Sequence, residues 1–256
     1  MNPVHPSAPK IKICGVTRRE DADAAVAVGA WALGLNFWRG SARHCRLGTA
    51  VEIAAVHRRH TQIAGVFVNP TLDHVVRVAD EVGLTMLQFH GDEGPAFCTE
   101  AARRTGCRVI KAARVRSGAD IQALAPFRTD FHLLDSHVPG VPGGTGETFA
   151  WELARHGVPS GPRVRARIPV ILSGGLTAEN VGEAISIVHP YAVDVASGVE
   201  SAPGMKDHDA LRAFAAAVAA TAPVVVEASG AGEGDGAGDG AGGERTGPGA
   251  SGERAA

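Results

Sequence analysis

Short apolar runs alternate with alanine-rich amphipathic stretches along most of this chain, from residue 10 to residue 222. The apolar runs are nearly continuous rather than interrupted by polar residues, which is typical of parallel strands covered on both faces. Eight strand–helix units in about 210 residues predict an α/β fold, a single (β/α)8 barrel of the TIM type. A doubly wound sheet also alternates strands with helices, but usually has fewer strands.

The apolar runs predict strands at Lys10–Cys14, Ala32–Phe37, Gln62–Val68, Thr85–Phe89, Arg108–Ala112, Phe131–Asp135, Val170–Ser173 and Val193–Ala196. The amphipathic stretches predict helices at Glu20–Val28, Thr49–Arg59, Leu72–Val82, Pro95–Thr105, Ala119–Ala125, Phe149–Arg155, Ala178–Val188 and Asp207–Thr221. Thr71 and Thr177 stand where N-caps of two of these helices are expected.

The composition changes sharply near residue 228. Residues 228–256 contain 11 Gly, five acidic residues and two Arg, with no aromatic or large aliphatic side chain. Such a segment cannot bury enough apolar surface to offset its ordering entropy. We therefore expect residues 223–256 to form a disordered tail, residues 1–9 a disordered N-terminus, and residues 10–222 the barrel domain.

The charge balance argues against a basic nucleic-acid-binding protein, since 25 Lys and Arg face 27 Asp and Glu. The four cysteines form no C-x-x-C pair, so neither a zinc site nor a disulfide framework is indicated and reduced thiols are expected. Residues 1–9 lack the apolar core of a signal peptide, and Phe214–Val226 is too short to span a bilayer. We expect a cytoplasmic protein that binds neither nucleic acid nor a membrane.

Polar residues at the carboxyl ends of the predicted strands are the candidates for catalysis, because the active site of this fold lies there. They are Cys14, Asn36, Asn69, Gln88 with His90, Lys111, Asp135, Ser173 and Ser197. Cys14 and Asp135 end strands on opposite sides of the mouth, and a thiol with a carboxyl group can serve as a general acid/base pair. Gln88 and His90 are candidates for substrate binding. No metal-binding cluster accompanies these residues.

Three glycine-containing loops follow the last three predicted strands. Glycine allows backbone N–H groups to approach an anion closely, and phosphate sites of this fold commonly lie after strands seven and eight. The loops therefore predict a phosphate-bearing ligand. The loops are Gly143-Gly144-Thr145-Gly146, Ser173-Gly174-Gly175 and Ser197-Gly198.

Several motifs together resemble the phosphoribosylanthranilate isomerase family of tryptophan biosynthesis. They are KICGVT at 12–17, GLNF…SAR at 34–43, GVFVN at 65–69, QFHGDE at 88–93, LLDS at 133–136, GGTGETFAW at 143–151, LSGGLTAENV at 172–181 and DVASGVE…PGMKD at 194–207. The resemblance covers residues 10–220 in order. It implies a (β/α)8 barrel that needs no cofactor and catalyses the Amadori rearrangement of N-(5-phosphoribosyl)anthranilate.

The resemblance also implies a role for several residues. It places the general base on Cys14 and the general acid on Asp135. It places on Arg43 the arginine that holds the anthranilate carboxylate. It assigns phosphate binding to the backbone of Gly144 and Thr145, Gly174 and Gly175, and Ser197 and Gly198. Because an ordinary thiol has a pKa of about 8.5, we expect Lys12 or backbone donors to help Cys14 form a thiolate.

Two alternatives stay open on the sequence alone. The first is the related histidine-pathway isomerase of a phosphoribosyl aminoimidazole, or a bifunctional enzyme, although those barrels resemble one another in an Asp at the end of strand one. The second is a non-catalytic phosphate-binding barrel, which loss of Cys14 or Asp135 would have favoured. We expect a monomer or homodimer, with contact to other tryptophan-pathway enzymes as a further expectation.

Overall fold

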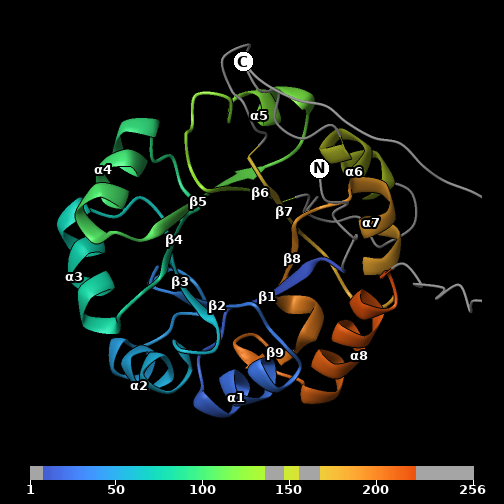
Figure 1. The fold of residues 1–256 in the computed structure, drawn as a ribbon, viewed down its shortest axis with the longest axis horizontal. Coiled ribbons are helices and arrows are strands. Elements are labelled where there is room, and N and C mark those ends of the chain that lie inside the picture. The colour runs from blue at the N-terminus through green and yellow to red at the C-terminus, as the bar shows by residue number, and fades with distance from the viewer. Residues whose placement is uncertain (1–7, 136–146, 156–167, 223–256) are drawn as a thin grey trace, which may run out of the picture. The chain divides into compact units, whose positions relative to one another are not determined.

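The fold is a closed barrel of parallel strands surrounded by helices, in a computed structural model that describes residues 8–135, 147–155 and 168–222 (Figure 1). Within these ranges, strands β1 to β8 follow one another around the barrel in chain order, and β8 closes the sheet against β1. The strands are β1 (Lys10–Cys14), β2 (Ala32–Asn36), β3 (Gln62–Phe67), β4 (Met86–Phe89), β5 (Arg108–Arg114), β6 (Phe131–Asp135), β7 (Val170–Ser173) and β8 (Ala192–Val195). The predicted (β/α)8 barrel is confirmed.

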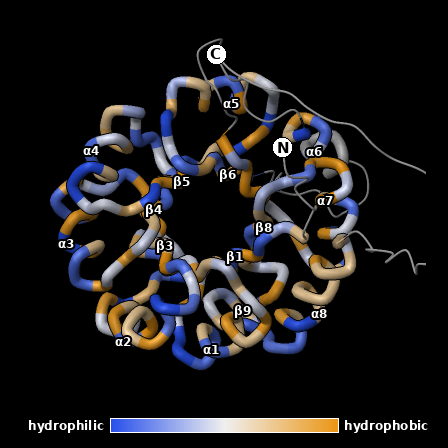
Figure 2. The backbone as a smooth tube through the Cα atoms, viewed as in Figure 1, coloured by the Kyte–Doolittle hydropathy of each residue, from blue (hydrophilic) through white to orange (hydrophobic). Residues whose placement is uncertain are grey.

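The outer layer consists of α1 (Arg19–Ala27), α2 (Leu47–His57), α3 (Leu72–Val82), α4 (Pro95–Thr105), α5 (Gly118–Gln122), α6 (Glu147–Arg155), α7 (Val181–Val188) and α8 (His208–Ala219). Hydrophobic and hydrophilic segments alternate along the helices in Figure 2. In α3 the buried residues Val75, Val78, Ala79 and Val82 recur every three or four positions, as an amphipathic helix requires. None of the helices in the described ranges is long and apolar enough to cross a membrane.

Most predicted boundaries agree with the structure to within two residues. Thr71 is the N-cap of α3, and its hydroxyl accepts a hydrogen bond from His74 N at 3.3 Å. Helices α3 and α4 end at Gly83 and Gly106, whose φ angles of 72° and 69° lie in the left-handed region favoured by glycine. Helix α5 ends three residues earlier than predicted, because the chain after Gln122 continues in tighter turns.

The predicted start of α7 is wrong. The helix begins at Val181 with Asn180 as its N-cap, rather than at Ala178 after a Thr177 cap. The Asn180 side chain accepts a hydrogen bond from Thr177 N at 2.8 Å and donates one to Gly175 O at 2.9 Å. This asparagine holds the preceding residues in a turn and delays the helix.

The lower part of the barrel interior is apolar. Its buried residues are Ala64, Met86, Ile110, Ala112, Phe131, Leu133, Ile171 and Ala192. Trp31 and Tyr191 pack against this cluster, with their ring centroids 5.5 and 5.3 Å from that of Phe131. Since side chains alternate along each strand, polar groups that follow these apolar positions on the same face lie at the carboxyl ends of the strands.

A short hairpin that the sequence did not predict follows β8. After the turn η1 (Ser197–Val199), strands β9 (Glu200–Ala202) and β10 (Met205–Lys206) pair antiparallel. Their connection is Pro203-Gly204, with Gly204 at φ +81°, a residue pair that suits a type II turn. The strands are too short to produce a periodic pattern, so only this turn signalled the hairpin.

Candidate active site

A cavity of about 620 Å³ opens at the carboxyl ends of the strands, between β5–β8 and the loop after β2. It is lined by Arg43, Arg114, Arg116, Asp135, Ser173, Gly174, Gly175, Leu176, Asp194, Val195, Ala196, Ser197 and Gly198. Seven of the residues predicted from sequence therefore share one cavity: Arg43, Asp135, Ser173, Gly174, Gly175, Ser197 and Gly198. The other two predicted phosphate-binding residues, Gly144 and Thr145, lie outside the described residues.

The loops after β7 and β8 meet at this cavity. Gly174 and Gly175 have φ angles of 100° and 63°, which L side chains rarely adopt. Gly198 packs directly against the carbonyl oxygen of Leu176, leaving no room for a Cβ atom. Only glycine suits these positions, so exposed backbone rather than side chains lines this corner of the cavity. Backbone of this kind suits an anion such as a phosphate.

Cys14 lies at the end of β1 beside a buried ion pair. Lys12, two residues earlier, bonds Asp194 Oδ1 on β8 at 2.7 Å, and Ser173 Oγ donates to the other oxygen of Asp194 at 3.1 Å. Lys12 and Asp194 are register partners where the barrel closes. The thiol also approaches Gly34 of β2 closely, since a Cβ atom there would lie 2.8 Å from Cys14 Sγ. The half-buried thiol thus sits among charged groups that β1 and β8 supply.

The electrostatics of Cys14 combine opposing influences. Burial is the largest and raises the pKa of the thiol; Asp194 adds to this, whereas Lys12 and Lys206 lower it. The net effect raises the pKa of Cys14, so Lys12 acts in the expected direction without outweighing burial. For Lys12 itself, burial opposes the charge, but Asp194 and Cys14 hold its pKa above the ordinary value. A thiolate formed here is scarce and strongly basic.

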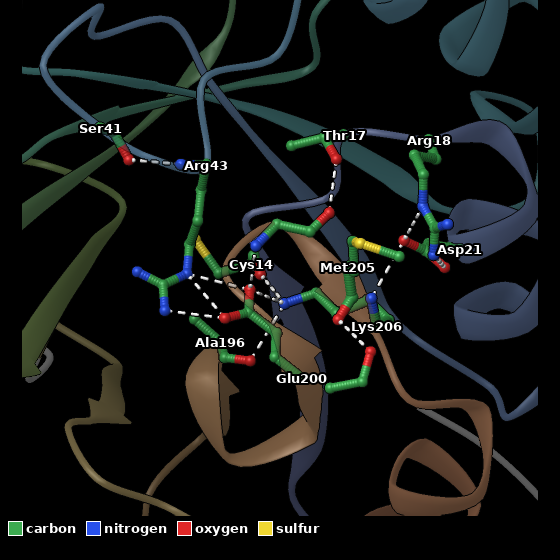
Figure 3. A network of polar contacts seen from close by, with 12 residues as sticks. Cys14, Thr17, Arg18, Asp21, Ser41, Arg43, Ala196, Glu200, Met205 and Lys206 are labelled. Atoms are coloured by element: carbon green, nitrogen blue, oxygen red, sulfur yellow. Dashed lines mark hydrogen bonds and ion pairs between the residues drawn. The ribbon is translucent and has the colours of Figure 1, made fainter.

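Arg43 reaches the cavity from the loop after β2, and Glu200 of β9 holds it (Figure 3). Its Nε donates to both Glu200 oxygens at 2.9 and 3.1 Å, and its Nη2 donates to Oε2 at 2.7 Å. Burial would raise the pKa of Glu200, but bonds from Arg43 and Lys206 hold it below its ordinary value. Because Glu200 occupies one edge of the guanidinium, the Nη1 edge is left for a ligand carboxylate.

Asp135 lies at the end of β6, across the barrel from Cys14, and is joined to a chain of polar side chains. His90 Nε2 is 3.4 Å from Asp135 Oδ2, and Gln88 Nε2 is 3.2 Å from His90 Nδ1. Gln88 is buried, and its Oε1 has no hydrogen-bond partner among the described residues. The structure therefore places His90 next to the predicted acid and Gln88 behind His90.

Three other polar residues predicted at strand ends lie outside this cavity. Lys111 and Asn69 belong to a hydrogen-bonded network between the loops after β3 and β4. Asn36 accepts a hydrogen bond from Trp38 N at 2.9 Å. In the described ranges, no group of three or more His, Cys, Asp or Glu side chains is arranged to hold a metal ion.

The sequence analysis overlooked Asp194, Glu200 and Lys206 as site residues. Asp194 carried a usable signal, because alternation along β8 points it inward, level with Lys12. Glu200 and Lys206 lie in the motif DVASGVE…PGMKD at 194–207, but their place beside Cys14 and Arg43 depends on the unpredicted hairpin.

The chain is similar to known proteins in both sequence and structure. A family model described as "N-(5'phosphoribosyl)anthranilate (PRA) isomerase" matches residues 11–217. The N-(5'-phosphoribosyl)anthranilate isomerase of Azotobacter vinelandii is 47% identical over 210 residues, which cover 81% of this chain and 96% of that protein. The enzyme of the same name from Trichlorobacter lovleyi is 45% identical over 205 residues, covering 80% and 95%.

Solved structures agree with these matches. The crystal structure of phosphoribosyl anthranilate isomerase from Thermotoga maritima has a TM-score of 0.71 at 38% identity, covering 82% of this chain and 98% of that one. A crystal structure of a phosphoribosyl anthranilate isomerase in complex with reduced 1-(o-carboxyphenylamino)-1-deoxyribulose 5-phosphate has a TM-score of 0.68 at 35% identity, with the same coverage. The chain belongs to the N-(5'-phosphoribosyl)anthranilate isomerase family.

Proposed function

We propose that this chain is an N-(5'-phosphoribosyl)anthranilate isomerase of tryptophan biosynthesis. It converts the phosphoribosyl amine by an Amadori rearrangement to 1-(2-carboxyphenylamino)-1-deoxyribulose 5-phosphate. The observation that carries the proposal is the cavity at the barrel mouth, where a carboxyl group, an arginine and two glycine loops converge beside a thiol. These groups match the needs of a substrate with a carboxylate, a phosphate and an acid-labile ring.

In this proposal Asp135 protonates the furanose ring oxygen. The C1′–O bond then breaks, and the nitrogen lone pair forms the C1′=N bond of a Schiff base. Cys14, as thiolate, removes the C2′ proton, and the electron pair forms the C1′=C2′ bond of an enolamine. Tautomerisation of the enolamine moves a proton to C1′ and leaves a ketone at C2′. The proton taken by Cys14 and the proton given by Asp135 balance, so no net acid or base is consumed.

Arg43 is proposed to hold the anthranilate carboxylate through its Nη1 edge, because Glu200 holds its other edge. The phosphate is assigned to the backbone of Gly174, Gly175, Ser197 and Gly198, together with Gly144 and Thr145. Gln88 and His90 are proposed to contact the substrate beside Asp135. The reaction as proposed uses no cofactor.

Location and assembly are part of the proposal. We assign the enzyme to the cytoplasm, in keeping with a biosynthetic family. We expect a monomer or a homodimer; the Thermotoga maritima enzyme is described as dimeric. Contact with other tryptophan-pathway enzymes stays a prediction.

The direct test is to mix the purified protein with phosphoribosylanthranilate and follow the loss of its fluorescence. Asp135→Asn keeps the shape of the side chain but cannot deliver the proton, so kcat should collapse while KM changes little. Asp73→Asn, a change at a side chain that is 94% exposed on α3, is the matched control and should leave kcat unchanged. A rise in KM alone would make Asp135 a binding residue.

The same assay separates the alternatives. A histidine-pathway isomerase would turn over the phosphoribosyl aminoimidazole substrate instead, and a bifunctional enzyme would turn over both. A non-catalytic barrel would turn over neither. Inorganic phosphate should compete weakly with phosphoribosylanthranilate if the glycine loops bind the phosphate group, and Gly174→Val should raise KM.

A further inference from the structure

Lys206 brings a buried ammonium group to the end of β1. Its side chain is fully buried, and its Nζ donates to Cys14 O at 2.6 Å, Ala196 O at 3.0 Å and Glu200 Oε1 at 2.9 Å (Figure 3). An ammonium has three N–H donors and no acceptor, and here three acceptors surround it. A neutral amine would turn its lone pair toward one of these oxygens. The geometry therefore matches a protonated lysine, although burial lowers its pKa against the opposing influence of Glu200.

Each acceptor belongs to a different part of the proposed site. The carbonyl of Cys14 ends β1 and belongs to the proposed base. The carbonyl of Ala196 directly precedes Ser197 and Gly198, which line the cavity. Glu200 holds Arg43. One cation thus joins the residue of the base, the start of an anion-binding loop and the anchor of the substrate arginine.

The hairpin that carries Lys206 is itself fixed to the barrel. Lys206 N donates to Asp21 Oδ2 of α1 at 3.1 Å, and Arg18 holds Asp21 through two hydrogen bonds. At the hairpin turn, Thr17 Oγ1 donates to Gly204 O at 2.5 Å. Because hydrogen bonds hold both β10 and the Pro203-Gly204 turn, the hairpin places Lys206 in a defined position at the mouth of the barrel.

We propose that Lys206 and Glu200 are positioning residues for the isomerase: Lys206 fixes the Cys14 end of β1 against β8, and Glu200 fixes Arg43. This inference rests on the proposed function, which supplies the role of Cys14 as the base and of Arg43 as the residue that binds the substrate carboxylate. It goes beyond that function by giving the β9–β10 hairpin a task in the reaction.

The charge of Lys206 also reaches the thiol. The charged groups that act on Cys14 are Lys12 from β1, Asp194 from β8, Lys206 from β10 and Arg43 from the loop after β2. Glu200 of β9 binds Lys206 and Arg43. Lys206 lowers the pKa of Cys14, against burial and Asp194. Its removal should therefore move thiolate formation to higher pH, whereas removal of the Glu200 charge should not.

The experiment measures two quantities on the full chain: the rate at which iodoacetamide alkylates Cys14 as a function of pH, and the kcat and KM for phosphoribosylanthranilate. The variants are Lys206→Met, Glu200→Gln and the double variant. The double variant removes both charges, so that no single buried charge is left unpaired. Mass spectrometry of peptides separates Cys14 from the three other cysteines, which are buried.

Lys206→Met should raise the pH midpoint of Cys14 alkylation by about one unit and lower kcat about 100-fold. Glu200→Gln should leave that midpoint at or below the wild-type value and raise KM about tenfold, because Arg43 loses its carboxylate. The double variant should show the raised midpoint and the raised KM together. Lys111→Met, which removes a buried lysine from β5, is the matched control and should leave the alkylation midpoint unchanged.

A folded double variant with the wild-type midpoint and wild-type KM would overturn the inference. If neither Lys206→Met nor the double variant folds, the Glu200→Gln variant is the test. An unchanged KM for phosphoribosylanthranilate in Glu200→Gln would then overturn the inference. Failure of the proposed function looks different: wild-type protein would not consume phosphoribosylanthranilate, while the alkylation profiles would still report on Lys206.

Discussion

Two buried lysines on opposite sides of the barrel mouth are bound in nearly the same way. Lys206, between β1 and β8, donates to two backbone carbonyls and Glu200. Lys111 of β5 donates to Gly91 O at 2.6 Å, Phe89 O at 3.5 Å and Glu93 Oε2 at 3.0 Å. In both clusters an ammonium ties the end of a strand to a glutamate that is itself buried.

The two glutamates differ in what else they bind. Glu93 accepts from backbone N–H groups, Asn69 N at 2.8 Å and Gly91 N at 2.9 Å, so its cluster ends in the loops. Glu200 binds the side chain of Arg43, which is 30% exposed and lines the cavity. A buried ion pair therefore does not identify a functional site. The next partner decides whether the pair serves the scaffold or holds a group that can meet a ligand.

The largest difference in kcat between the Lys206 side and the Lys111 side of the barrel mouth should follow removal of a cysteine thiol. Cys14→Ala should lower kcat by roughly 10²–10⁴, as for loss of a positioned base, with little change in melting temperature. Cys98→Ala, at a buried thiol of α4 on the Lys111 side, should cost stability but keep kcat within a few-fold. Steady-state kinetics and thermal melts of both variants measure this. Near wild-type turnover in Cys14→Ala would remove Cys14 from the mechanism.

Breaking the Lys111 cluster should act on stability. Lys111→Met leaves Glu93 buried without its cation, which typically costs about 3–5 kcal/mol of unfolding free energy. The pH dependence of kcat should keep its wild-type midpoint, because the cluster does not face Cys14. Urea unfolding and a pH–rate profile test the two halves of this statement. A shifted midpoint would mean that both lysines act on the thiol.

Adding one methyl group should have a smaller effect, and the effect should differ between the two sides of the barrel mouth. In Gly34→Ala the new Cβ would lie 2.8 Å from Cys14 Sγ and 3.1 Å from Lys12 Nζ, so the thiol must move and kcat should fall about tenfold. Gly94→Ala, before α4, adds a Cβ that meets nothing within 4 Å, and its stability should change by no more than about 0.5 kcal/mol. Equal kinetics for the two variants would contradict the close packing around Cys14.

The smallest effect is expected outside both clusters. The composition after Glu227 offers no apolar anchor, so truncation there should leave kcat, KM and melting temperature essentially unchanged. The same assays on the truncated chain are sufficient. A several-fold loss of activity, or a melting temperature lower by several degrees, would show that the tail docks.

Rules that use only the order of strands and helices predicted the fold and several candidate site residues. Strand ends predicted Cys14 and Asp135, and the Gly174-Gly175 loop followed from the usual phosphate position of the fold. These predictions need only the order of elements, because every parallel strand of a barrel points its carboxyl end to the same face. They fail where a short polar side chain reshapes the backbone, as Asn180 does before α7.

The sequence by itself determined the barrel, its apolar interior and the face on which the predicted site residues lie, because these depend on periodicity and strand order within a few tens of residues. Only the tertiary structure decided which charges surround Cys14. Lys206 meets Cys14 across 192 residues of chain, and Lys12 meets Asp194 across 182. The closure of β8 on β1 creates the contact of Lys12 with Asp194, and the hairpin after β8 creates that of Lys206 with Cys14. No local pattern encodes the register of that closure.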